Sequence, residues 1–143
     1  MYGQLLFTFQ MITIVFCLVP LSLTWPKPLT LLLLVLQALL TLWILAVNRL
    51  GNWSVFPQPL ERAKLITSGP YGLIRHPMYT VVMLFGLTAV LHNQTLTSVV
   101  SFALLVLILR LKAGYEESLL LKQFEHYAGY MSRTSKRFIP WIL

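Results

Sequence analysis

Two long apolar runs open the chain, and each is long enough to cross a membrane as a helix. Residues 5–24 contain no charged residue and would rise about 30 Å as an α-helix, which matches the thickness of a hydrocarbon core. Residues 29–47 are still more uniformly apolar. Between the runs, the prolines of Trp-Pro-Lys-Pro at 25–28 are expected to end one helix and start the next. The pattern therefore predicts two membrane-spanning helices.

Two shorter apolar stretches follow in the second half of the chain. They cover residues 78–91 and 96–109, and the polar sequence His-Asn-Gln-Thr at 92–95 separates them. This pattern predicts a helical hairpin whose helices cross the membrane with help from flanking residues. Together, the four stretches predict an all-α polytopic membrane protein with four transmembrane helices.

Polar segments lie between and after these stretches. Residues 48–77 mix basic residues with proline and glycine, which predicts an extramembrane connector of about 30 residues, long enough to carry function. After Arg110 the chain is polar and basic again, and several residues recur every three or four positions: Glu116, Leu120, Phe124, Tyr127 and Met131. This spacing predicts that the fourth helix continues out of the membrane with these residues on one face.

The composition supports a membrane protein. Of the 143 residues, 57% are hydrophobic and 10% are charged, whereas soluble domains carry about 25% charged residues. Four crossings leave no room for a separate soluble domain. We expect a single membrane-embedded domain over 1–143, with two spans in 1–48 and the functional core in 49–143.

The net charge of +7 indicates a membrane topology rather than nucleic-acid binding, because the lysines and arginines flank the apolar runs. With four spans, the basic residues place both termini and the 48–77 connector in the cytoplasm. The membrane would be the cell inner membrane in a prokaryote and the endoplasmic reticulum in a eukaryote. The single cysteine, Cys17, excludes a disulfide framework and a thiolate metal site, and is expected to be a small core or lipid-facing residue.

The polar sequence "TSGPYGLIRHPMYT" at 67–80 is the first candidate for chemistry. One interpretation is structural: Pro77 starts a helix with His76 near its cap, while Arg75 reaches lipid headgroups and Tyr79 lies in the interface. The other is that His76 and Tyr79 donate hydrogen bonds to a polar ligand, and that the Ser-Gly-Pro-Tyr-Gly turn brings backbone amides close to it.

A second candidate lies at Glu116 and Glu117, one turn after Lys112. These residues would form an exposed pair with an ordinary i,i+4 contact, or a carboxylate and a cation that bind a ligand. The other histidines, His92 and His126, are expected to be structural. Three scattered histidines predict no metal site, and no phosphate-binding loop, dinucleotide fingerprint or serine nucleophile elbow is present in the sequence.

Taken in order, several of these sequences resemble the isoprenylcysteine carboxyl methyltransferase family, integral membrane enzymes that use S-adenosylmethionine. The resemblance covers about residues 61–140, and it depends on "TSGPYGLIRHPMY" at 67–79, the glutamate pair, Phe124, Tyr127, Tyr130 and "RFIP" at 137–140. It implies a cofactor pocket formed by the connector, the start of the third helix and the C-terminal tail.

The resemblance also implies roles for individual residues. Lys112 would contact the substrate and act in catalysis, although the family typically has arginine there, and Val81 stands where the family usually has a glycine that allows close helix packing. Phe124 and Tyr127 are one residue closer together than usual. The residues expected to bind the cofactor are Ala63, Lys64, Leu65, Ile66, Tyr71, His76, Pro77, Met78, Tyr79 and Glu116.

The implied reaction is methyl transfer from S-adenosylmethionine to the carboxylate of an isoprenylcysteine, which enters from the bilayer. An ionised carboxylate is already a nucleophile, so alignment matters more than acid or base help. Two other interpretations stay open. A phospholipid amine, or a small lipophilic thiol, could be the acceptor, and an amine would need a general base such as Glu117. The chain could also be a non-catalytic membrane subunit or carrier.

Overall fold

A computed structural model describes residues 1–19, 27–48 and 64–139. Within these ranges the chain is helical and contains no strand, so the all-α prediction is confirmed. The helices are α1 (Tyr2–Leu18), α2 (Pro28–Val47), α3 (Pro70–Leu73), α4 (Pro77–Asn93), α5 (Leu96–Gln123) and α6 (Tyr127–Arg133).

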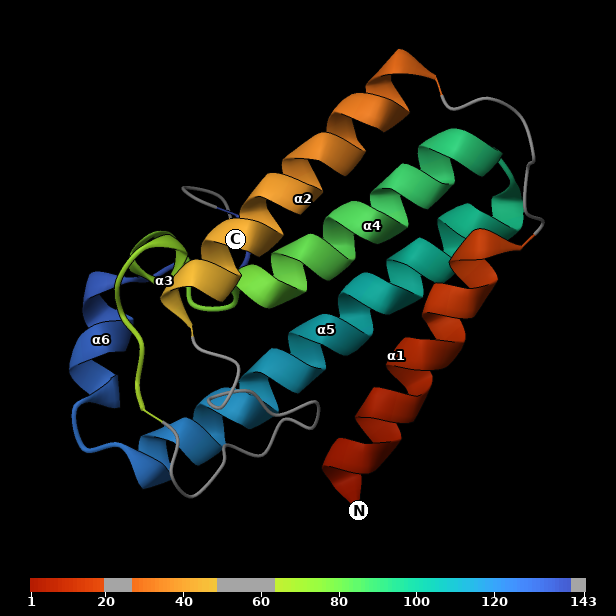
Figure 1. Cartoon of the computed structure of the whole chain (residues 1–143). Helices are drawn as coiled ribbons and strands as arrows, with labels where there is room; N and C mark the ends of the chain where they lie inside the picture. The colour runs from red at the N-terminus through yellow and green to blue at the C-terminus, as the bar shows by residue number, and fades with distance from the viewer. Residues whose placement is uncertain (20–26, 49–63, 140–143) are drawn as a thin grey trace.

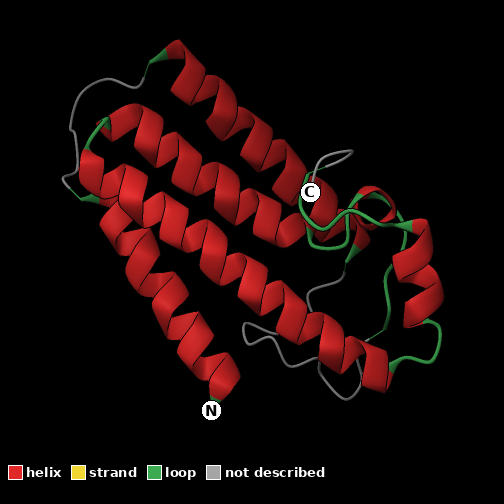
Figure 2. Ribbon diagram, turned by 180° about the vertical axis from the view of Figure 1, so that it is seen from behind, coloured by secondary structure: helices red, strands yellow, loops and turns green. Residues whose placement is uncertain are grey.

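The four long helices lie side by side in the order α2, α4, α5, α1 (Figures 1 and 2). Each packs against its neighbour in that order, and α1 also contacts α4. The short helices α3 and α6 lie together at the end of the bundle where α2 ends and α4 begins (Figure 1). We call this the polar end, and we call the rest of the bundle, from the middle of α4 and α5 to the turn between them, the hairpin end.

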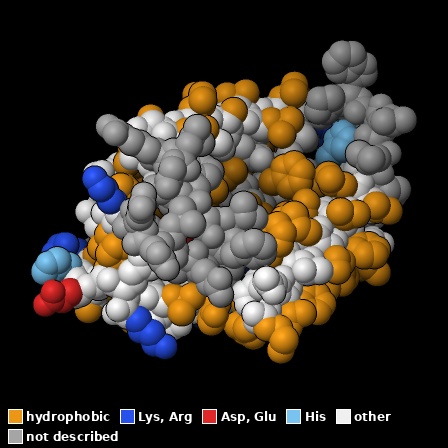
Figure 3. All heavy atoms as spheres, turned by 60° about the horizontal axis from the view of Figure 1, so that its bottom comes forward, with side chains coloured by type: hydrophobic (Ala, Val, Ile, Leu, Met, Phe, Trp, Pro, Cys, Tyr) orange, Lys and Arg blue, Asp and Glu red, His pale blue; other side chains and the backbone are white. Residues whose placement is uncertain are grey.

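Among the described residues, two helices are long and apolar enough to cross a membrane: α2, with 20 residues, and α5, with 28. The apolar helices α1 and α4 have 17 residues each and are shorter than the usual span. Crossing by all four therefore stays a prediction. Large hydrophobic side chains on α1 and α2 are exposed, among them Phe9, Val15, Leu32 and Leu39, as expected for surfaces that face lipid. Hydrophobic side chains cover much of the face shown in Figure 3.

The helical hairpin predicted from the second pair of apolar stretches is present. Pro77 occupies the first position of α4, where a proline costs no hydrogen bond. The connecting residue Gln94 adopts a left-handed conformation with φ of 55°. Thr95 then caps α5, because its hydroxyl accepts a hydrogen bond of 3.2 Å from the backbone of Ser98.

The fourth helix continues beyond the apolar stretch, as predicted, but only to Gln123. The single helical face from Glu116 to Met131 was a wrong prediction, because Phe124 is extended and α6 starts afresh at Tyr127. The break has a physical reason: it turns Tyr127 and Tyr130 inward, where both are buried.

Close packing holds the hairpin end together. Cys17, Ala89, Leu105 and Leu109 form a buried cluster, so Cys17 is a core residue. At Gly86 the helices α4 and α5 approach so closely that an added Cβ would lie 2.7 Å from the Phe102 ring. The close approach that a glycine at position 81 would have allowed therefore occurs five residues later.

Candidate active site

A glycine turn places the first part of the site against the end of α2. Gly69 has a φ of +59°, and a Cβ on it would lie 2.7 Å from Val47, so both the backbone conformation and the available space favour glycine. The turn carries Tyr71, whose hydroxyl accepts a 3.0 Å hydrogen bond from Asn48. The Tyr71 carbonyl accepts another, of 2.7 Å, from the Tyr130 hydroxyl. Tyr71 is therefore fixed from two sides.

The segment after α6 pairs with the start of α4. The backbone amide of Arg75 donates to the carbonyl of Lys136, and that of His76 donates to the carbonyl of Arg137, both at 2.9 Å. One turn into α4, Thr80 donates to the carbonyl of Phe138 at 2.6 Å. Residues 136–138, which we call the C-terminal strap, thus pass across the start of α4.

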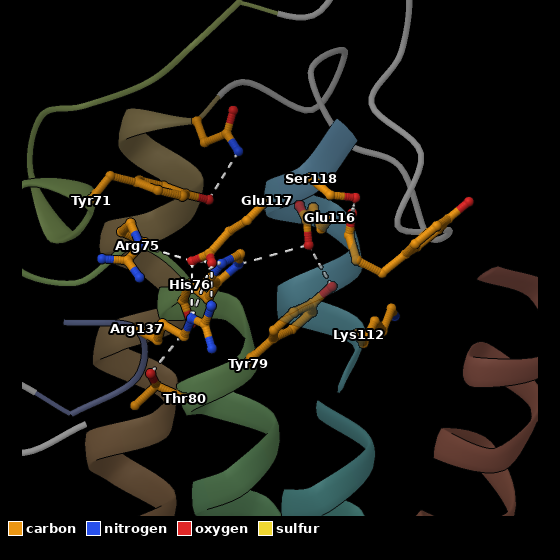
Figure 4. A network of polar contacts seen from close by, with 12 residues as sticks. Tyr71, Arg75, His76, Tyr79, Thr80, Lys112, Glu116, Glu117, Ser118 and Arg137 are labelled. Carbon is orange, nitrogen blue, oxygen red and sulfur yellow. Dashed lines mark hydrogen bonds and ion pairs between the residues drawn. The ribbon is translucent and has the colours of Figure 1, made fainter. Parts of the chain in front are cut away.

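Glu117 is the centre of the polar network drawn in Figure 4. Its Oε1 accepts from Arg75 Nε at 2.8 Å and lies 3.1 Å from His76 Nε2, and its Oε2 accepts from Arg137 Nη2 at 2.6 Å. The Glu117 side chain is only 4% exposed. A carboxylate with both oxygens bound to cationic donors is held in its ionised form and cannot readily take a proton.

Glu117 also sets the orientation of His76. Because the carboxylate accepts, Nε2 carries the hydrogen, and Nδ1 faces the other glutamate at 3.7 Å from Glu116 Oε2. The imidazole stacks on the Tyr79 ring with a centroid distance of 5.2 Å and an angle of 4°. The Tyr79 hydroxyl donates to Glu116 Oε2 at 2.6 Å. Glu116 is thus the carboxylate that borders the open space, while Glu117 lies behind His76.

Lys112 lies one turn before Glu116 and is only 3% exposed. Its ammonium donates to Gln10 Oε1 of α1 at 2.8 Å. The same ammonium lies 5.5 Å from the centre of the Phe7 ring and 5.2 Å from that of Tyr79, within reach of both π-faces. A hydrogen bond and two aromatic rings therefore accompany this buried charge.

These side chains surround one cavity of about 390 Å³, within the range of about 300–1,000 Å³ typical of small-molecule sites. In Figure 4, Tyr71 and Arg75 lie to one side of Tyr79 and Glu116, and Lys112 lies to the other. The cavity is lined by Phe7, Gln10, Met11, Asn48, Tyr71, Arg75, His76, Pro77, Met78, Tyr79, Val82, Lys112 and Glu116.

Burial raises the pKa of the Tyr71 hydroxyl, and the hydrogen bond from Asn48 lowers it by less. Since the ordinary pKa of tyrosine is about 10, the phenol keeps its proton at neutral pH. Its oxygen already accepts from Asn48, so the hydroxyl is able to donate to a ligand in the cavity.

Most of the residues expected from sequence lie around this cavity. Seven line it: Tyr71, His76, Pro77, Met78, Tyr79, Lys112 and Glu116. Lys64 is exposed, while Leu65 and Ile66 are half-buried, and none of the three is among the lining residues. Ala63 falls outside the described residues, as does half of the 48–77 connector, residues 49–63.

Two structural interpretations from sequence are corrected. Arg75 does not reach outward to lipid headgroups; it bonds Glu117 and also donates to the Thr134 carbonyl at 2.7 Å. The two glutamates are not an exposed pair, because Glu117 is buried and Glu116 has a side chain 28% exposed. Arg75 and Glu117 therefore pair with each other inside the protein instead of facing lipid headgroups or water.

Sequence reasoning also missed the contribution of α1. Phe7, Gln10 and Met11 form part of the cavity wall, whereas the pocket was expected from the connector, the start of the third helix and the tail alone. One signal was available: Gln10 is a polar residue within an uncharged apolar run, and such residues usually face the protein interior.

Comparison with known proteins identifies a family. Residues 25–127 match the family described as phospholipid methyltransferase. The chain is also 32% identical over 118 residues to the cobalt-zinc-cadmium resistance protein CzcN of Cupriavidus metallidurans. That similarity covers 80% of this chain and 51% of the relative, so the chain spans about half the relative's length.

Proposed function

The chain belongs to the phospholipid methyltransferase family, which is related to the isoprenylcysteine carboxyl methyltransferases, and on this basis we propose which methyl transfer it performs. The proposed reaction moves a methyl group from S-adenosylmethionine to a carboxylate on a lipophilic acceptor, with an isoprenylcysteine as that acceptor. The main observation in support is the cavity that joins Glu116 and Tyr79 to the buried ammonium of Lys112.

The residues on the Tyr71 side of the cavity fit the methyl donor. S-adenosylmethionine supplies a methyl group on a cationic sulfur and carries ribose hydroxyls and an amino group. The Glu116 carboxylate has accepting capacity beyond its bond to Tyr79, so it can accept from these groups. The Tyr71 hydroxyl and the His76 ring add polar contacts on the same side. The negative charge of Glu116 also favours a cationic ligand.

Lys112 fits an anionic acceptor on the other side. Its ammonium is buried, where charge interactions are stronger than in water, so it can hold and orient a carboxylate. One aromatic ring joins the two sides, because Tyr79 contacts Lys112 with its face and Glu116 with its hydroxyl. The methyl donor and the acceptor would therefore both lie next to Tyr79, which brings them close together as an in-line displacement requires.

The family description also supports a second acceptor, the amine of a phospholipid. An alkylammonium must lose a proton before it can attack, so that reaction needs a general base. Glu117 is unsuited to the role because Arg75, His76 and Arg137 occupy its oxygens. The task would fall to Glu116. A lipophilic thiolate, by contrast, would find the same support from Lys112 as a carboxylate.

Two further proposals concern the setting of the reaction. We place the site at the cytoplasmic face, following the distribution of lysine and arginine. The lipid part of the acceptor would approach from the bilayer past the apolar lining residues Phe7, Met11 and Val82. The whole chain would then work as one membrane-embedded domain.

Isothermal titration with S-adenosylhomocysteine tests the donor site. We expect the detergent-solubilised protein to bind it, Glu116→Ala to abolish measurable binding, and Glu125→Ala to bind as wild type, since Glu125 is exposed on the polar segment. Folded wild type without binding would contradict the proposal and favour a non-catalytic membrane subunit. Binding would be followed by turnover assays with N-acetyl-S-farnesylcysteine and with phosphatidylethanolamine.

A further inference from the structure

Gln10 is a buried amide in the middle of α1, and the mechanism above gives it no role. It is 6% exposed and lies on the helix that forms the outer wall of the cavity. Placing a polar side chain in an apolar helix is costly unless its groups are bonded. Its oxygen is satisfied by Lys112 at 2.8 Å, across more than a hundred positions of the chain.

The chemistry of the pair fixes which way the amide faces. An ammonium only donates hydrogen bonds, so the Gln10 oxygen must face Lys112, and the amide nitrogen keeps two donors. That nitrogen hydrogen-bonds to no other residue in the described part of the chain. The Gln10 nitrogen is not among the fully buried polar atoms that lack a partner, and the Gln10 side chain lines the cavity. Gln10 thus brings unused donors to the cavity beside a buried cation.

We propose that Gln10 and Lys112 form a paired donor site for the two oxygens of the acceptor's carboxylate, and that Gln10 is a specificity-determining residue. This inference deepens the proposed function and rests on it. An ammonium with three donors can bind Gln10 and an anion together, and the neighbouring amide can bind the second oxygen.

The same pair selects against an amine head group. An acceptor ammonium would meet the positive charge of Lys112 and an amide that offers it only N–H groups, so it would be repelled and left without acceptors. The adjoining residues of α1 are apolar, with Phe7 and Met11 also lining the cavity. The acceptor that fits is therefore a carboxylate attached to an apolar chain.

The transfer step also changes the contacts of this site. A carboxylate oxygen forms a bond to the methyl carbon while the carbon–sulfur bond breaks. The electron pair of the broken bond stays on the sulfur, which leaves as a neutral thioether. The acceptor becomes a neutral ester, and no proton is taken or released. Because the ester has lost the charge that Lys112 attracts, it binds less tightly than the carboxylate, which favours its release.

The test compares Gln10→Glu and Gln10→Met with Gln4→Glu, a matched change at an exposed position of the same helix. Gln10→Glu pairs Lys112 with a second charge and repels a carboxylate. Steady-state kinetics with N-acetyl-S-farnesylcysteine should show kcat/KM reduced about tenfold or more, chiefly through KM. The apolar, similarly shaped Gln10→Met should lower it by a smaller factor. Gln4→Glu should behave as wild type.

Binding of S-adenosylhomocysteine serves as the second measurement and reports folding of each variant. We expect it to stay within about twofold of wild type in all three, since Gln10 lies on the acceptor side. Wild-type KM for the carboxylate in both Gln10 variants would overturn the inference. A wild type that binds S-adenosylhomocysteine but methylates only phosphatidylethanolamine would overturn both this inference and the carboxylate acceptor of the proposed function, while leaving the donor site intact. If wild type binds no S-adenosylhomocysteine, the proposed function itself fails, which is a separate outcome.

Discussion

The polar end and the hairpin end of the bundle are held by different interactions. At the hairpin end, Gly86 lets α4 lie close to α5, and apolar side chains such as Leu105 fill the contact. At the polar end, buried charges and backbone hydrogen bonds connect α4, α5 and the C-terminal strap, with Glu117 at the centre. The site lies at the end where directional bonds dominate.

The difference follows from what each kind of contact can do. Lipid is as apolar as leucine, so helices in a membrane associate through close packing and polar contacts rather than through hydrophobicity. Packing keeps the helices together but tolerates small shifts of side chains. Hydrogen bonds and ion pairs impose distances and angles, which a reaction that depends on alignment requires. The hairpin end therefore supports the fold, and the polar end specifies the site.

Breaking the polar network at its centre should have the largest effect. Glu117→Gln leaves the buried Arg75 and the strap residue Arg137 without their anion. Removing one partner of a buried ion pair typically costs about 3 kcal/mol or more. We expect the free energy of unfolding in detergent to fall by about that amount, and binding of S-adenosylhomocysteine to weaken because His76 loses its orienting partner.

Glu125→Gln is the matched control for this substitution, because it removes the same charge from an exposed position of the polar segment. It should change stability by less than about 0.5 kcal/mol. If Glu117→Gln were equally mild and retained full binding, the network would not be what organises the site, and the contrast between the two ends would lose its basis.

At the hairpin end, Gly86→Ala should have a smaller but clear effect. The new methyl group would lie 2.7 Å from Phe102 and 3.0 Å from Leu105, so both side chains must shift. Overpacking of this kind costs about 1–3 kcal/mol. We expect lower thermal stability but nearly unchanged affinity for S-adenosylhomocysteine, because neither Gly86 nor the two side chains that must shift line the cavity.

Gly114→Ala provides the opposite control, since open space surrounds that position of α5. Alanine there should raise stability by about 0.5–1 kcal/mol through helix propensity alone. Loss of cofactor affinity in Gly86→Ala, at unchanged fold, would mean that the hairpin end also controls the site.

The smallest predicted effect is the contribution of Tyr130, at the polar end, to the pH dependence of stability. Burial raises the pKa of Tyr130 above its ordinary value of about 10, although the nearby Arg75 opposes the shift. The folded state therefore holds this proton more tightly than the unfolded state. The resulting stabilisation is complete below pH about 10 and is lost as the pH rises through the higher folded-state pKa.

Tyr130→Phe removes both this titration and the 2.7 Å hydrogen bond to the Tyr71 carbonyl. Its stability should be about 1 kcal/mol lower at neutral pH and should fall less steeply than that of wild type above pH about 10. Denaturant unfolding at several pH values measures both. Identical slopes for the two proteins would show that Tyr130 does not contribute to the alkaline loss of stability.

The fold was largely predictable because its signals are local. Apolar runs located α2 and the hairpin of α4 and α5, and the proline rules placed the starts of two helices at Pro28 and Pro77. Hydrophobic periodicity did not reveal the break at Phe124, because the residues on either side keep a helical spacing. Burial of the Tyr127 and Tyr130 rings offsets the cost of that break, and this burial depends on tertiary contacts.

The candidate site was predictable only in part, for the same reason. Motif resemblance placed His76, Tyr79 and Glu116 around one ligand site, and the structure brings these residues together. No spacing rule indicated that Glu117 pairs with Arg137 rather than with solvent, since ion pairs between distant segments leave no periodic pattern. The approach of Gln10 to Lys112 depends on how α1 packs on α5, which the sequence of neither helix specifies alone.

The C-terminal strap also has a consequence for biosynthesis. Its hydrogen bonds join residues 75 and 76 to residues 136 and 137, and Glu117 is fully paired only when Arg137 is present. The ribosome completes α1, α2, α4 and α5 before it reaches the strap. The helices must therefore associate through packing such as that at Gly86 while Arg75 still lacks the finished network. In this order of synthesis the Glu117 network is completed only after the strap has been made, so a nascent chain, or one truncated before residue 136, lacks the Arg137 ion pair.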